Sequence, residues 1–141
     1  TERQRRSMKI HIILLGLVLC LPLMAADKKP LTKEESAKVI EAAIREAAKK
    51  PKGELTKADY KKVTRLSLLG NQLTSVKGLE KLTQLKSLNL RANQLTDVKG
   101  LEKLTQLEDL WLDNNPDLTK AQIDELKKAL PNCFILSNPT K

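Results

Sequence analysis

A run of 14 residues occurs twice in this chain, and the two copies start 22 residues apart. The copies are QLTSVKGLEKLTQL, residues 72–85, and QLTDVKGLEKLTQL, residues 94–107, which differ only at Ser75 and Asp97. A fixed period in the twenties with leucines in phase is typical of a solenoid, in which each unit buries its apolar side against its neighbours. The chain is therefore expected to be a stack of short units, an architecture that usually serves binding.

Apolar residues keep the same phase in each unit and define its strand. The alternation around Leu88 and Leu90 has a period of two, which predicts a short strand with its leucines inward and the intervening residues outward. Each unit returns through a connector, LTxVKGLEKL, so successive strands should be parallel. We therefore expect an α/β solenoid with a parallel concave sheet. Its inward positions are Val63, Leu66, Leu68; Leu85, Leu88, Leu90; and Leu107, Leu110, Leu112.

Helix signals precede the first repeat and predict a cap. Thr32 with Glu35, and later Thr56 with Asp59, have the spacing of a capping box, and Pro51 separates the two. The pattern predicts a first helix and a short second one. The first helix would cover the open apolar end of the solenoid, as terminal units require. Its expected buried residues are Ile40, Ala43, Ile44 and Ala47.

The end of the chain predicts a second cap. Thr119 and Gln122 form another capping-box pattern, and Pro131 should end the helix that follows. A shift of 23 residues then aligns Leu110 with Cys133, which predicts a fourth strand over residues 133–136 and a buried Cys133. The apolar face of this helix would be Ile123, Leu126, Ala129 and Leu130.

These repeats and their flanks resemble bacterial leucine-rich repeat proteins of the 22-residue, internalin-like type. The resemblance rests on the unit L-x-x-L-x-L-x-x-N-x-L and on the closing segment LxxNPDLTxxQIxxLxxxLPxC, residues 112–133, and it covers roughly residues 34–136. It implies a leucine-rich repeat solenoid with a helical N-terminal cap and a helix-strand C-terminal cap. It does not imply a particular partner, because a fold alone does not assign a function.

The first 26 residues predict export. Basic residues precede an apolar run, residues 10–26, which ends in small residues and is short for a membrane span. We expect a secretory signal peptide that starts at Met8, with an uncleaved anchor or a lipid on Cys20 as alternatives. The protein would then be periplasmic, cell-surface or secreted. The expected divisions are a signal peptide (1–26), a linker and N-terminal cap (27–62), the repeats (63–118) and a C-terminal cap (119–141).

Charge and residue types exclude several functions. The formal charge is +9, and it falls to +6 without residues 1–26, which hold four basic residues and one acidic residue. Lysine and glutamate alternate in the repeats, so no nucleic-acid partner is expected. The one histidine, His11, lies in the signal segment, and metal-ligand clusters and phosphate loops are missing from the sequence. We therefore expect no enzyme activity, no cofactor and no metal.

Asparagines recur in phase at positions 71, 93 and 115, where each strand ends. An inward asparagine at such a place can hydrogen-bond backbone groups that would otherwise be buried without a partner. We therefore predict a structural role for Asn71, Asn93 and Asn115 rather than a ligand site.

Recognition is expected on the outward strand positions. We predict Trp111 and Phe134 as apolar anchors, side by side on adjacent strands about 4.8 Å apart. Alternatively, the two aromatics cover the end of the sheet beneath the tail, residues 137–141. Charge complementarity would come from Arg65, Arg91, Asp109 and Asp113, with Asn89 between them. The three predicted rows are Arg65, Ser87, Asp109, Asn132; Ser67, Asn89, Trp111, Phe134; and Leu69, Arg91, Asp113, Leu136.

The sequence therefore favours an exported scaffold that binds another protein through its concave face. Two alternatives remain, a structural or self-assembling envelope protein and a binder of glycan or cell wall. Four strands give a sheet less than about 20 Å wide, whereas a stable interface needs about 800 Å² on each partner. We therefore expect weak binding, help from the repeat edges or self-association. A membrane would be involved only through an uncleaved signal or a lipid.

Overall fold

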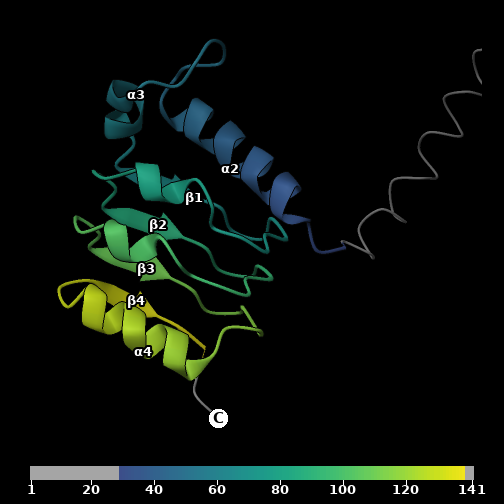
Figure 1. The fold of residues 1–141 in the computed structure, drawn as a ribbon, viewed down its shortest axis with the longest axis vertical. Coiled ribbons are helices and arrows are strands. Elements are labelled where there is room, and N and C mark those ends of the chain that lie inside the picture. Colours follow the sequence, from purple (N-terminus) through teal and green to yellow (C-terminus); the bar gives the residue numbers. More distant parts are fainter. Residues whose placement is uncertain (1–28, 139–141) are drawn as a thin grey trace, which may run out of the picture.

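A computed structural model describes residues 29–138 as a stack of repeats closed by helices at both ends (Figure 1). The expected signal peptide and the last three residues lie outside the described residues. Within residues 29–138 no helix has the length and apolar character needed to span a bilayer. The sheet contains four parallel strands in sequence order, namely β1 (Arg65–Ser67), β2 (Ser87–Asn89), β3 (Asp109–Trp111) and β4 (Phe134–Leu136). This confirms the predicted solenoid with its parallel sheet.

The leucine rows form the core, as the period of the sequence predicts. Leu66, Leu88 and Leu110 are partners on adjacent strands and point inward, and Leu88 and Leu110 are fully buried. The connectors contain two short 3-10 helices, η2 (Leu79–Lys81) and η3 (Leu101–Lys103). Each follows a glycine with a positive φ, 104° at Gly78 and 100° at Gly100, a conformation that side chains with a Cβ rarely adopt. The two turns therefore require glycine.

The N-terminal cap begins with helix α2 (Lys33–Ala47), whose capping box is the predicted one. The Thr32 side chain accepts a hydrogen bond from the Glu35 N–H, and the Glu35 carboxylate accepts one from the Thr32 N–H. Ile40 and Ile44 are buried against the first repeat, but the buried residue at the end of the helix is Ala48 rather than the expected Ala47.

Polar contacts join this cap to the first repeat. The Ser36 hydroxyl is fully buried and accepts a hydrogen bond from the Thr74 N–H at 3.1 Å. The Thr74 hydroxyl donates to the Leu31 carbonyl at 2.8 Å. Each of these hydrogen bonds joins residues about 40 positions apart in the sequence. Because hydrogen bonds are directional, they fix the orientation of the cap on the repeats, which apolar burial alone would not do.

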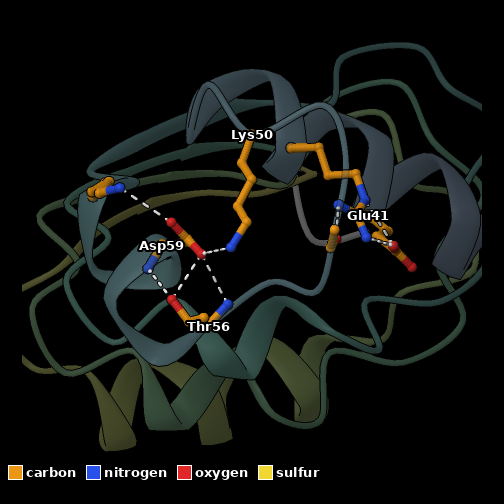
Figure 2. A network of polar contacts seen from close by, with 7 residues as sticks. Glu41, Lys50, Thr56 and Asp59 are labelled. Atoms are coloured by element: carbon orange, nitrogen blue, oxygen red, sulfur yellow. Dashed lines mark hydrogen bonds and ion pairs between the residues drawn. The ribbon is translucent and has the colours of Figure 1, made fainter.

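The second predicted capping box begins helix α3 (Lys57–Lys62) and is part of a larger network around Asp59 (Figure 2). The Asp59 carboxylate accepts hydrogen bonds from the Thr56 N–H and hydroxyl at 2.9 and 2.7 Å. It also lies 2.7 Å from the Lys50 ammonium and 3.1 Å from that of Lys62. The Lys50 ammonium, and after it the Thr56 donors and Lys62, hold the pKa of Asp59 well below its ordinary range.

We expect the Asp59→Asn variant to melt several degrees below the parent at pH 7. The folded state depresses the pKa of Asp59, so its contribution to stability is complete above the unfolded pKa of about 3.9 and is lost as the pH falls below that value. The Tm difference between parent and variant should therefore shrink from pH 7 to pH 2, measured by circular dichroism. Glu54→Gln, in the same loop but exposed, is the control and should change Tm little. A Tm difference that stays constant with pH would contradict this account.

The C-terminal cap contains helix α4 (Lys120–Ala129), which begins at the predicted capping box of Thr119 and Gln122. Ile123, Leu126 and Leu130 are buried as expected, whereas Ala129 is exposed. The fourth strand exists, but its predicted register is wrong by two residues, because Leu110 pairs with Ile135 and not with Cys133.

The length of the helical connector explains this error. Helix α4 has ten residues where the earlier units have a three-residue 3-10 helix, and a turn at Pro131 follows it. The Cys133 N–H donates to the Leu130 carbonyl at 3.1 Å, as the Leu107 N–H donates to the Leu104 carbonyl at 3.0 Å. Cys133 therefore closes the turn before its strand, as Leu107 does, but it lies one residue before β4 and is half-buried rather than fully buried.

Candidate interaction surface

The outward residues of the four strands form two rows across the concave sheet. The first row runs through Arg65, Ser87, Asp109 and Phe134, and the second through Ser67, Asn89, Trp111 and Leu136. Both rows begin polar at β1 and become apolar at β4. The concave face therefore has an apolar end formed by Trp111, Phe134 and Leu136, which we call the apolar end from here on.

The predicted pairing of Trp111 with Phe134 is wrong. The β4 register places Phe134 beside Asp109, and Trp111 beside Leu136. Phe134 and Leu136 are two residues apart on one strand, so they point to the same face, and Trp111 lies diagonally opposite Phe134. Phe134 is 61% exposed and Leu136 39% exposed, whereas Trp111 is half-buried. The sequence placed Leu136 in a different row and so missed it as a neighbour of the tryptophan.

The charged candidates are divided between the two ends of the face. Arg65 is exposed on β1 and lies at the end opposite the apolar one. The side chains of Arg91 and Asp113 form an ion pair at 2.7 Å just beyond the strands. Asp109 is half-buried between Ser87 and Phe134, and the Asn89 side chain accepts a hydrogen bond from the Arg91 N–H. Of the four charged candidates, Arg65 and Asp109 are thus the two that lie on the strands themselves.

The predicted structural role is confirmed for two of the three repeated asparagines, Asn93 and Asn115. Asn93 and Asn115 are fully buried. The Asn93 side chain accepts from the N–H groups of Asn71 and Leu73 at 3.1 and 3.0 Å, and it donates to the carbonyls of Leu68 and Leu90 at 2.9 Å. Asn93 therefore joins two neighbouring units.

The first asparagine of the series differs from the other two, and Asn138, from outside the series, binds the last of them. Asn71 is exposed, and among residues 29–138 its side chain donates only to the Leu69 carbonyl, because the neighbour on its other side is a helical cap rather than another repeat. The Asn138 side chain donates to the Asn115 carbonyl at 2.7 Å and accepts from the N–H groups of Asn114 and Asn115. The repeat phase does not point to Asn138, because it comes two residues after β4 whereas Asn115 comes four residues after β3.

Cys133 has the properties of a packing residue. It is half-buried against the core. Burial, and to a smaller extent the charge of Asp109, raises the pKa of the Cys133 thiol to about 11. Because the thiolate is the reactive form of cysteine, this thiol is poorly nucleophilic at neutral pH.

Four hollows of the described surface lie away from the outward residues of the strands. Four hollows of about 400 to 710 Å³ lie around the connectors and helices, and none of them is lined by the outward residues of the strands. In residues 29–138 no three His, Cys, Asp or Glu side chains are grouped to hold a metal ion. Small ligands bind in concave pockets, so these four hollows are the places where one would fit.

Comparison with known proteins agrees with this architecture. A family model described as Leucine Rich repeats (2 copies) matches residues 61–101 and 83–128. The crystal structure of the internalin InlF from Listeria monocytogenes is 27% identical with a TM-score of 0.60, over 70% of this chain and 28% of that one. Internalin C2 (InlC2) of the same organism is 25% identical with a TM-score of 0.62, over 73% of this chain and 56% of that one. Comparison with curated proteins found no match.

The repeat pattern, the parallel sheet and these matches define a solenoid of the leucine-rich repeat class. Among such proteins the chain is similar in fold to the internalins InlF and InlC2. It spans less than two thirds of the length of either internalin. The repeats and the internalin neighbours support a protein-interaction scaffold.

Proposed function

We propose that this chain is an exported scaffold that binds a partner protein through its concave face, without enzyme activity. The observation that carries the proposal is the apolar end, where three large apolar side chains lie together on the outward side of β3 and β4. Aromatic residues in the middle of a contact usually supply most of the binding energy of an interface. Export is supported by the basic and apolar segment within residues 1–26.

The remaining concave residues fit the edge of such a contact. Ser67, Ser87 and Asn89 are neutral hydrogen-bonding groups between the apolar end and the exposed Arg65. Asp109 lies directly beside Phe134, where it would favour a cationic group on the partner. Arg91 and Asp113 neutralise each other, so we place them at the rim of the contact. A partner would therefore present an apolar group flanked by a positive charge.

The test compares residues 27–141 with the double variant Trp111→Ala/Phe134→Ala in affinity capture from an envelope extract of the native host. The core runs from Leu31 to Ile135, so this fragment contains all of it. We expect the double variant to lose the captured protein by at least tenfold, because two apolar anchors are removed together. Truncation of Phe134, which is mostly exposed, should cost little stability, whereas truncation of the half-buried Trp111 should lower the Tm. Circular dichroism at the capture temperature therefore checks that the double variant is folded.

Leu69→Ala is the matched control, because Leu69 is also a large exposed apolar residue, 54% exposed, but lies beyond β1 at the other end. It should leave capture unchanged. Equal recovery with the parent and the double variant would contradict the proposed site. Recovery of the chain itself as the only partner would support a self-assembling envelope protein. Recovery of wall glycan would support a binder of glycan or cell wall.

A further inference from the structure

The net charge of the described chain is concentrated at one end. Residues 49–65, the loop between α2 and α3 together with α3 and the start of β1, contain seven basic and two acidic residues. The other described residues contain 13 basic and 13 acidic residues, so their charges balance. The whole formal charge of +5 in residues 29–138 therefore belongs to these 17 residues, which we call the basic tip. Figure 1 shows the α2–α3 loop and α3 at the end of the molecule opposite β4 and α4.

Most cations of the basic tip are available to solvent. Lys49, Lys52, Lys57 and Lys61 are exposed, and within the described residues none of them forms an ion pair. Lys57 and Lys61 are four residues apart on α3 and so share one face of that helix, an arrangement of like charges that weakens a helix slightly. These lysines do not contribute to the stability of the cap through ion pairs.

The loop that carries these lysines is held in place by the network of Figure 2. Asp59 binds both Lys50 and Lys62, so one carboxylate brings two ammonium groups together. The Arg45 guanidinium donates to the Gly53 carbonyl at 2.8 Å and fixes the middle of the loop to α2. The basic tip is therefore a preorganised surface, which lowers the entropic cost of binding an anion.

We propose that the basic tip binds an anionic phospholipid surface. A bilayer presents negative charge over an extended plane, which matches lysines spread over a loop and a helix at one end of the molecule. A chain that is neutral elsewhere orients its charged end toward such a surface. Single-stranded nucleic acid fits less well, because Tyr60, the one aromatic residue of the tip, is half-buried and offers no stacking platform. The Lys81 ammonium lies 5.5 Å from the centre of its ring. A DNA duplex, which needs no stacking, is an outcome of the test.

The experiment is co-sedimentation of residues 27–141 with vesicles of equal parts phosphatidylglycerol and phosphatidylcholine, beside vesicles of phosphatidylcholine alone. Each lysine close to an anionic bilayer strengthens binding about fivefold. We therefore expect binding to the anionic vesicles only, lost at about 0.5 M salt because of screening. The variant with Lys49, Lys52, Lys57 and Lys61 all changed to Gln should bind at least about 20-fold more weakly.

A matched variant separates the position of the charges from their number. It changes four exposed lysines outside the tip, Lys99, Lys103, Lys127 and Lys128, to Gln, so its net charge equals that of the tip variant. Its binding to the vesicles should stay within about threefold of that of the parent. The four lysines changed in it lie outside the basic tip, and charges more than a Debye length from the bilayer contribute little. Equal losses in the two variants would overturn the proposal, as would binding to neutral vesicles at the same strength. Binding to a DNA duplex without binding to vesicles would overturn the choice of lipid.

Discussion

Replacing the buried Asn93 by Ala should lower the free energy of unfolding by about 3 to 5 kcal/mol, enough to unfold much of a marginally stable domain. The substitution removes one side chain that satisfies the N–H groups of Asn71 and Leu73 and the carbonyls of Leu68 and Leu90. Each buried polar group left without a partner costs about 1 to 3 kcal/mol. Urea unfolding followed by circular dichroism measures the change.

Asn71→Ala is the matched control, because it removes an asparagine in the same phase of the repeat. Asn71 is exposed, and within the described part of the chain its side chain makes a single hydrogen bond, to the Leu69 carbonyl at 3.2 Å. We expect a change of about 0.5 kcal/mol or less. If the two variants were equally stable, the buried hydrogen bonds of Asn93 would not be what joins the units.

The second large effect is expected for Leu88→Ala, in the middle of the sheet. Leu88 is fully buried and has Leu66 on one side and Leu110 on the other. Truncation leaves a cavity that rigid neighbours on two strands cannot fill, so the cost should be about 3 to 4 kcal/mol. The midpoint of urea unfolding should fall accordingly, with the same dependence on denaturant.

Ile135→Ala is the corresponding change at the edge of the same row. Ile135 pairs with Leu110 on one side only and is half-buried. We expect about half the loss seen at Leu88, because less apolar surface is uncovered and solvent can fill the space. A larger loss at Ile135 than at Leu88 would show that the C-terminal cap, and not the central repeats, limits stability.

The local parts of this fold could be predicted from sequence. The three capping boxes at Thr32, Thr56 and Thr119 use contacts within four residues, so their patterns carry all the required information. The inward leucines follow from a period of two within each strand and of 22 between units, since identical units must stack with identical faces inward. The two periods predicted the solenoid, and the resemblance to leucine-rich repeats rested on the unit L-x-x-L-x-L-x-x-N-x-L and on the closing segment.

The candidate site was predicted less well, because its composition depends on how the last unit returns to the sheet. The number of residues that α4 and its following turn use is set by how the helix packs beside η3, and the sequence period does not specify it. The observed register of β4 differs from the predicted one by two residues, and a shift of two keeps the same side chains outward. Phe134 is therefore on the concave face as predicted. The residue directly beside Trp111, however, is Leu136 and not Phe134.

The sequence by itself determined which residues face inward and where the capping helices begin, because both are encoded by spacing along a few residues. Only the tertiary structure decided the neighbours of Trp111, the joining role of Asn138 and the meeting of Lys50 and Lys62 at Asp59. Each of these features is a contact between side chains of different segments. The distance and orientation between such segments are set by how their side chains pack, which the repeat pattern does not specify.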